Sequence, residues 1–259
     1  MTAPTATPPL PPAIRIGRFF RRTLATLAIV ALAVALLFLA WAAIRGRPQD
    51  LPWTPLDLGD PIGAATGRKL TGLRDDFPAC EALMRRAGVR YTALPPRQDG
   101  ATCGYDDGLR LTSGGARRIA FAPADLGIAC PVAASLAMWE WNVVQPAAQQ
   151  LLGSTVTTID HFGSYNCRRM YGREGSNWSE HATANAVDIA GFRLADGRRI
   201  TIVGDWSGDD AEAQFLRTVR DGACRLFATT LSPDYNAAHR DHLHLDHAAR
   251  GAIGGRACR

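Results

Sequence analysis

Two short stretches in the last third of this chain contain the residues best suited to metal chemistry. The first holds His181 and Asp188, and the second holds His242 and His244. Two histidine nitrogens and one carboxylate oxygen are a common ligand set for catalytic zinc, which keeps one position for water. Zinc lowers the pKa of that water and polarises a substrate carbonyl. The two stretches therefore predict a zinc site that can hydrolyse an amide bond.

The second stretch has the alternation of a β-strand. Its period of two places His242, His244 and Asp246 on one face and the two intervening leucines on the other. In the first stretch, the apolar neighbours of Asp188 put this carboxylate on a polar face in the same way. We expect the apolar faces to pack on the core and the polar faces to meet at a cleft.

The elements that position these residues read as an α+β domain. Strands and helices are mixed without regular alternation, and residues 75–259 hold all of them. We expect helices over 80–87, 133–152 (kinked at Pro146) and 209–227; a strand over 156–159; strand pairs 109–112 with 118–122 and 187–193 with 200–203; and a last strand through Leu243 and Leu245. Residues 45–74, rich in proline and glycine, are predicted to be a linker or a strap along the domain surface.

The positive charge of the chain lies at its N-terminus. Residues 1–47 hold six of the 29 basic residues and no acid, which leaves 23 basic against 24 acidic residues in the rest. A nucleic-acid-binding domain needs a basic face on its folded part, so we predict no nucleic-acid partner. Residues 1–22 are expected to be a disordered, basic, cytoplasmic segment, because 1–14 are mostly proline, threonine and alanine.

An apolar run over residues 23–44 predicts a transmembrane signal anchor. From Leu24 to Ile44 only Thr26 is polar, and a helix of that length spans about 31 Å, close to the ~30 Å hydrocarbon layer. Four arginines before the run and two after it favour an N-terminus inside the cell and the domain outside. A cleaved signal peptide is the alternative, because Ala40-Trp41-Ala42 has the small-x-small form of a cleavage site.

The cysteines indicate an oxidising compartment. All six follow residue 75 and none forms a C-x-x-C pair, so neither a cysteine zinc site nor a thioredoxin motif is indicated. An even count behind an export signal predicts up to three disulfides. Six cysteines allow fifteen pairings, of which nearness in sequence favours Cys80 with Cys103.

The motif residues also have simpler interpretations. A single histidine is more often a surface or hydrogen-bonded residue than a ligand, and the histidine-rich stretch would suit a polar edge strand. Two histidines and a carboxylate also bind iron(II) in oxygenases, but there the carboxylate usually follows the first histidine by two residues. Asp188 follows His181 by seven. The presence of both stretches in one exported, cysteine-containing domain favours zinc.

The motifs resemble those of a known superfamily. Ser179-x-His181-x-x-x-x-Ala186-x-Asp188 resembles the Ser-x-His-x-x-Gly-x-Ala-x-Asp signature of the D-Ala-D-Ala carboxypeptidases and murein endopeptidases, and His242-Leu-His244 resembles their His-x-His. The region from about Asp75 to the end, with Cys167-Arg168-Arg169, resembles the bacterial extensin-like C-terminal domain family, which is related to those zinc peptidases. The resemblance implies their hedgehog-like core, a mainly antiparallel sheet packed with helices.

The resemblance also implies roles for individual residues. The zinc ligands would be His181, Asp188 and His244. His242 would lie beside the metal, and Arg168, in a Ser-x-x-Arg-like setting, would bind a substrate carbonyl or carboxylate.

The general base is left open between two residues. Asp241 stands three residues before the last ligand, where the superfamily often has a carboxylate, but it needs a bend in the strand to reach the metal. His239, five residues before the ligand, is the alternative. In addition, Ala184 replaces the signature glycine, so that turn must form without a residue suited to positive φ.

Together these features predict a single-pass protein of the bacterial inner membrane with its C-terminal domain in the periplasm, or a periplasmic protein after signal cleavage. The expected activity is zinc-dependent hydrolysis of peptide bonds in peptidoglycan stem peptides or cross-links, as a D,D- or L,D-carboxypeptidase or endopeptidase. The alternative is a non-catalytic wall-binding or structural module whose zinc stabilises the fold.

Overall fold

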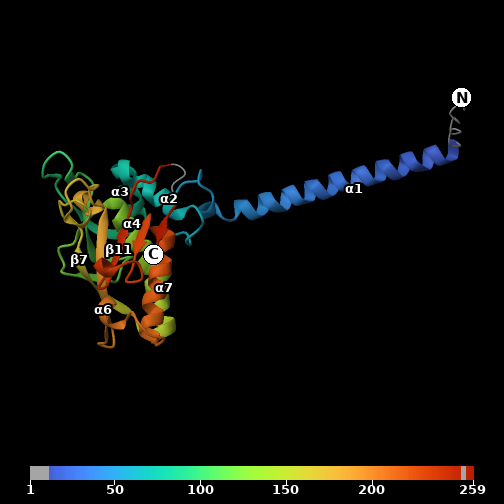
Figure 1. Cartoon of the computed structure of the whole chain (residues 1–259). Coiled ribbons are helices and arrows are strands. Elements are labelled where there is room, and N and C mark those ends of the chain that lie inside the picture. Colours follow the sequence, from blue (N-terminus) through green and yellow to red (C-terminus); the bar gives the residue numbers. More distant parts are fainter. Residues whose placement is uncertain (1–11, 252–254) are drawn as a thin grey trace, which may run out of the picture. The chain divides into compact units, whose positions relative to one another are not determined.

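The computed structural model describes residues 12–251 and 255–259, with side chains from residue 21 onward. It separates into two compact units that divide after Pro48, and each is described by itself. The described part of the first unit is mostly helix α1 (Pro12–Arg45), the long helix in Figure 1. Its stretch Arg21–Arg45 is long and apolar enough to cross a membrane. A membrane anchor and an N-terminal signal sequence both meet this criterion.

Helix α1 begins before the apolar run. Because α1 starts at Pro12, the disorder predicted for residues 12–22 is wrong, and residues 1–11 lie outside the described part. Proline fits the first position of a helix, and no further proline interrupts the chain before Pro48.

The second unit starts at Gln49, earlier than the predicted boundary near Asp75. Residues 49–74 are a strap that belongs to the core and not a free linker. Leu58 and Leu70 are fully buried there, and α2 (Thr66–Thr71) is helical. The apolar side chains of this segment follow no helical or strand period among its prolines and glycines, which is why the sequence pattern concealed them.

The main sheet is mostly antiparallel, as predicted. Along its main path the strand order is β12-β10-β11-β8-β7-β5, with β9 pairing the far end of β8. Only the pairs β5–β7 and β10–β12 are parallel. The strands are β5 (Ala120–Ala122), β7 (Val156–Gly163), β8 (Ala186–Leu194), β9 (Arg199–Thr201), β10 (Thr229–Leu231), β11 (Leu243–Asp246) and β12 (Ala257–Cys258).

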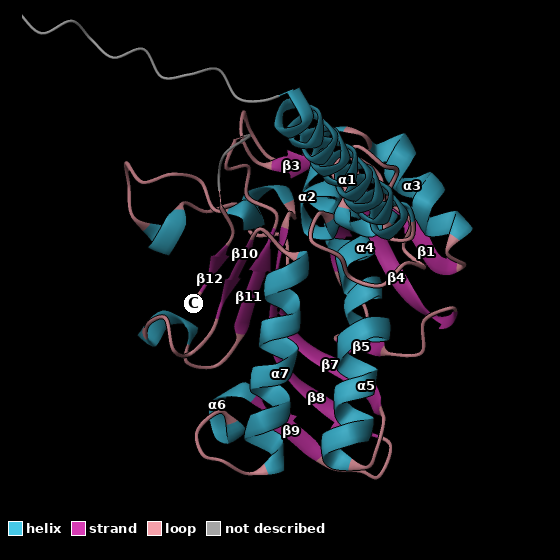
Figure 2. Cartoon of the chain, turned by 90° about the vertical axis from the view of Figure 1, so that its right-hand side faces the viewer, coloured by secondary structure: helices cyan, strands magenta, loops and turns pink. Residues whose placement is uncertain are grey.

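Helices cover one face of this sheet. Helices α4 (Cys130–Trp139) and α7 (Ala211–Leu226) lie side by side across it with α5 (Gln145–Ala147), as Figure 2 shows. The inward side chains of β8 and β11, such as Val187 and Leu243, are fully buried. α7 begins with Asp210 as its cap, whose side chain accepts from Ala213 N. The α+β class is therefore confirmed.

The predicted helix over 133–152 forms as one continuous helical run. Its α-helical parts are interrupted by π-helical turns over Glu140–Val144 and Ala148–Leu152, which flank the short α5 segment. Pro146 lies between them and has no backbone N–H to donate. The wider turns accommodate the proline without ending the helix.

The strand pair predicted over 109–122 is wrong. β4 (Gly108–Gly115) pairs with β1 (Val89–Ala93) and β6 (Gly127–Ala129) in a separate sheet, whereas β5 joins the main sheet beside β7. A buried ion pair keeps the chain after Arg117 from pairing back onto β4, because Arg117 Nε lies 2.9 Å from Glu140 Oε2. Glu140 also accepts from the backbone N–H groups of Arg118 and Ile119.

Three disulfides join all six cysteines, and the predicted Cys80–Cys103 pair is not among them. The pairs are Cys80–Cys130, Cys103–Cys167 and Cys224–Cys258. Cys80 on α3 (Phe77–Arg86) faces the start of α4, while Cys103 reaches the segment that precedes the first predicted ligand. These disulfides suit a location outside the cytoplasm.

Candidate metal centre

The three predicted ligands converge on one point at the face of the sheet opposite α7. Asp188 and His244 are direct cross-strand partners in β8 and β11, and His181 comes from the 3₁₀ turn Glu180–Thr183. His244 Nδ1 lies 2.9 Å from Asp188 Oδ1 and 3.1 Å from His181 Nε2. His181 Nε2 lies 3.2 Å from Asp188 Oδ2. One ligand atom from each residue lies within 4.8 Å of the other two.

The outer nitrogen of His181 is fixed by the backbone. His181 Nδ1 lies 2.6 Å from the carbonyl oxygen of Ser164. A carbonyl only accepts, so Nδ1 donates its proton there, and in the neutral ring Nε2 presents a lone pair to the cluster. The turn itself is held by Ser179, whose Oγ accepts from His181 N at 3.3 Å.

The ring of His244 is fixed by a carboxylate. Its outer nitrogen Nε2 lies 3.0 Å from Asp246 Oδ2, so Nδ1 is the nitrogen that faces Asp188. Burial lowers the pKa of His244, but hydrogen bonds to Asp188 and Asp246 outweigh it and raise this pKa to about 9. The cluster thus attracts positive charge at the position of Nδ1.

These side chains fit a metal ion. With both outer nitrogens donating outward, the three inner atoms are all acceptors when the rings are neutral, so a proton on His244 Nδ1 or a cation must lie among them. Buried acceptors in such contact are costly unless a cation lies among them. Two imidazole nitrogens and a carboxylate oxygen are a common set of zinc ligands. The outer nitrogens of the two histidines contact a carbonyl and a carboxylate, which are the usual partners of a metal-bound imidazole.

The turn between the ligands forms in spite of Ala184. This alanine has φ +54° and lies in the left-handed region that the signature glycine would favour. Its carbonyl oxygen accepts from Ala129 N at 2.9 Å and from Ser164 Oγ at 3.1 Å. Hydrogen bonds from two other segments therefore hold the strained residue.

The further histidines of the second stretch lie around the cluster. His242 Nε2 is 3.6 Å from Asp188 Oδ1. The ring of His239, which is buried, has its centroid 5.2 Å from that of His242 and 6.0 Å from that of His244. Burial, followed by the charges of the neighbouring histidines, lowers the pKa of His239 to about 4, so this ring is neutral at neutral pH.

Asp241 contacts His242 and not the three residues of the cluster. β11 begins at Leu243, so the bend that Asp241 requires is present. Its carboxylate Oδ1, however, lies 2.9 Å from His242 Nδ1, which directs the other nitrogen of His242 towards Asp188. Asp241 therefore orients His242.

Arg168 lies on the segment between Cys167 and the first ligand. Its side chain is half-buried, and its charge contributes to the lowered pKa of His239. The Cys103–Cys167 disulfide and a backbone hydrogen bond from Ser179 N to Arg168 O hold this segment beside the ligand turn.

A cleft of about 500 Å³ reaches the cluster at His244 and Asp246. Aromatic side chains line it, and of the seven large apolar residues exposed in the described part after α1, five lie here or beside His242. They are Phe162, Met170, Tyr171, Trp178 and Tyr235. Exposed aromatic residues grouped at one cleft indicate a binding surface.

Sequence reasoning placed Asp246 on the polar face but gave it no function. Its position two residues after a ligand in a strand was a readable signal for a carboxylate behind the histidine. The sequence did not indicate the carbonyl of Ser164, because every residue has a backbone carbonyl. It did not indicate the aromatic wall of the cleft either, because Tyr171 and Trp178 lie in a loop without a periodic pattern.

Comparison with known families covers most of the domain. A family model described as extensin-like protein C-terminus matches residues 78–259, which include the three predicted ligands, Arg168 and the whole second stretch. No curated protein and no solved structure matches the chain. Since the matched region spans well over half of its length, the chain belongs to the extensin-like C-terminal family.

Proposed function

We propose that this protein is a zinc-dependent peptidase that hydrolyses peptide bonds in peptidoglycan stem peptides or cross-links. The observation that carries the proposal is the convergence of His181, Asp188 and His244, in which the outer nitrogen of each histidine is already hydrogen-bonded. The resemblance of the two motifs to those of murein peptidases supplies the substrate class.

A catalytic site is favoured over a structural one by the number of ligands. Structural zinc sites are closed by four protein ligands, whereas catalytic sites use three and leave a position open. Three residues form the cluster among the described residues. His239 and His242 stand beside it as acid–base groups that a structural site would not need.

When bound, zinc would lower the pKa of a coordinated water and polarise the substrate carbonyl. The neutral His239 then accepts the proton from the attacking water. His242, held by Asp241, delivers a proton to the leaving amine. Asp241 in this scheme acts by positioning His242, and His239 takes the part of the general base.

Arg168 and the aromatic cleft orient the substrate in this proposal. The charge of Arg168 acts on His239, and its guanidinium would stabilise the negative charge that develops on the carbonyl oxygen. The walls formed by Tyr171, Trp178 and Tyr235 bind the peptide beside His244. Helix α1 would hold the domain at the inner membrane with its cleft in the periplasm, where the disulfides are stable.

The alternative is a wall-binding module in which zinc only stabilises the fold. Purified full-length chain in detergent, incubated with isolated sacculi, separates the two. When the sacculi are afterwards digested with a muramidase, the proposal predicts shortened or uncross-linked muropeptides. This change should disappear with a chelator, and it should also disappear with His239→Ala at an unchanged zinc content. Binding to sacculi with unchanged muropeptides, under conditions where the chain holds zinc, would support the structural module instead.

A further inference from the structure

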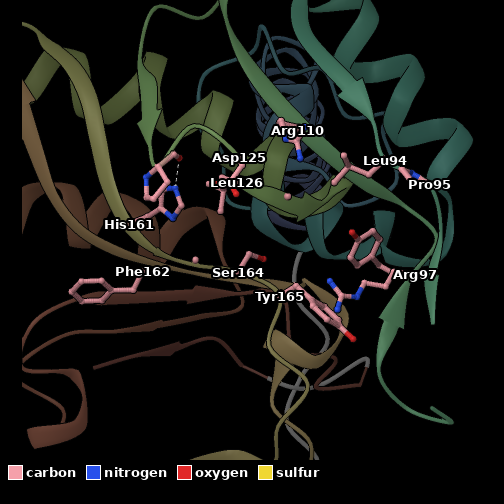
Figure 3. Close-up of a pocket in the computed structure, with 14 residues that line it drawn as sticks. Leu94, Pro95, Arg97, Arg110, Asp125, Leu126, His161, Phe162, Ser164 and Tyr165 are labelled. Carbon is pink, nitrogen blue, oxygen red and sulfur yellow. Dashed lines mark hydrogen bonds between the residues drawn. The ribbon is translucent and has the colours of Figure 1, made fainter. Parts of the chain in front are cut away.

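A second cavity, of about 540 Å³, lies beside the metal centre where β7 ends. It opens between this strand end, the loop after β5 and strand β4, as Figure 3 shows. The cavity and the metal centre share one wall, the segment Phe162–Tyr165. The carbonyl of Ser164 accepts from His181, and the ring of Phe162 lies 5.9 Å from that of His242.

One cation in this cavity has no anionic partner. Arg110 lines it from β4, and its buried Nε makes no hydrogen bond. Within the described residues no carboxylate lies within ion-pair distance of this guanidinium. The other arginine of the cavity, Arg97, is neutralised, because its Nε lies 2.7 Å from Asp99 Oδ2 and its guanidinium lies over the ring of Tyr165. Arg110 is therefore free to bind an anion from outside the chain.

Acceptors without donors lie in the same cavity. His161 is 8% exposed, and its Nε2 donates to the carbonyl of Pro123 at 2.7 Å (Figure 3), which leaves Nδ1 as a buried acceptor without a partner. Asp125, also on the wall, is exposed and forms no ion pair among the described residues. Buried polar groups are seldom left unpaired, and Arg110 and His161, each with one such atom, line the same cavity.

We propose that this cavity binds an α-amino-acid centre, that is, an ammonium and a carboxylate on one carbon, at the free end of a stem peptide. Arg110 binds the carboxylate, and Asp125 with His161 Nδ1 binds the ammonium. The shared wall Phe162–Tyr165 then lets the rest of the same peptide reach the metal centre. This inference rests on the proposed function for the substrate class and extends it to the choice of substrate.

Three matched stem pentapeptides test the cavity. The parent has a diamino diacid at its third position, followed by D-Ala-D-Ala, and the side-chain end of this residue is a free amino-acid centre. One analogue replaces the residue by lysine, which lacks the side-chain carboxylate, and the other has the side-chain amine acetylated. Titration calorimetry with the full-length chain in detergent measures binding, and product analysis of the same samples records cleavage. We expect each analogue to bind at least about tenfold more weakly than the parent.

Substitutions in the cavity show which residue binds the carboxylate of the ligand and which binds its ammonium group. Arg110→Gln should weaken the parent by about tenfold and remove the difference between the parent and the lysine analogue. Asp125→Asn should remove the difference between the parent and the acetylated analogue. Arg86→Gln, which removes a charge from the exposed side of α3, should leave all three affinities unchanged.

Equal affinity of the wild-type chain for the three peptides, or no measurable binding of any of them, would overturn the inference, and this readout does not depend on the variants folding. The two proposals fail separately. Discrimination without cleavage contradicts the peptidase alone, whereas cleavage without discrimination contradicts only the cavity.

Discussion

Asp246 Oδ2 lies 3.0 Å from His244 Nε2, at the opposite edge of the ring from the nitrogen that faces Asp188. The strand alone produces this contact, because residues two apart in β11 share a face. Asp246 is itself buried and also accepts from Ala248 N at 2.9 Å. The proton on His244 Nε2 is thereby held on the side of the ring away from the cluster.

Asp246→Asn should weaken zinc binding by about 10- to 100-fold, the usual effect of losing a carboxylate behind a ligating histidine. The amide can donate to Nε2 and so favour the tautomer with its proton on Nδ1. Competition with a chromogenic chelator measures the affinity. Asp209→Asn, at a fully exposed position, is the control, and equal zinc affinity in both variants would refute the assignment.

His239→Ala and Asp241→Asn should differ in how far they lower kcat. If His239 is the base, its loss lowers kcat by about 10²–10⁴-fold at every pH. Asp241→Asn should give a smaller loss, because it only releases the ring of His242. Rates on a soluble cross-linked muropeptide across pH 5–9 decide between them. The larger loss in Asp241→Asn would make that carboxylate the base.

The sequence predicted the convergence of the candidate site more fully than it predicted the fold. The resemblance of the motifs singled out His181, Asp188 and His244, and the pairing of β8 with β11 brings Asp188 and His244 together. The hairpin over 187–203 and the helix from Asp210 were also readable, from a tight turn and a 3.6-residue period.

What the sequence did not show depends on contacts between distant segments. The Arg117–Glu140 ion pair favours the pairing of β5 with β7 in the main sheet, and no local sequence pattern predicts this ion pair. The burial of Leu58 and Leu70 depends on surfaces made later in the chain. Likewise, the proximity of Cys103 to Cys167 exists only once the segment before His181 is folded.

Removing the Cys103–Cys167 disulfide should affect both stability and metal binding. Replacing both residues by serine should lower the free energy of unfolding by about 4 kcal/mol, from the loop of 64 residues that it closes. Zinc affinity should fall as well, because the bridge holds the segment between Ser164 and Arg168. Urea unfolding and zinc titration measure the two effects.

The matched control for that bridge is Cys224–Cys258, which ties β12 to α7 and joins segments that hold none of the predicted ligands. Its double serine variant should lose comparable stability and keep its zinc affinity. Equal zinc affinity in the two double variants would contradict a role of the first bridge in the site.

Asp107 should make the domain less stable as the pH rises from 4 to 6. Burial raises the pKa of this carboxyl from 3.8 to about 6, so over that range the folded state binds more protons than the unfolded state and the free energy of unfolding falls with pH. Above pH 6 the loss is on the order of 3 kcal/mol.

Asp107→Asn removes this titration and keeps an acceptor for Cys130 N. The variant should be more stable than the wild type at pH 7.5 and close to it at pH 4. Urea unfolding at the two pH values measures the difference. An equal effect of the substitution at both values would show that the carboxyl does not titrate in this range.

The zinc content of the purified full-length chain tests the central claim most directly. After incubation with zinc and removal of the excess, elemental analysis should find about one zinc per chain in the wild type and in His239→Ala, and almost none in His181→Ala or His244→Ala. A wild-type chain without zinc, or stoichiometric zinc in His181→Ala, would contradict the metal centre.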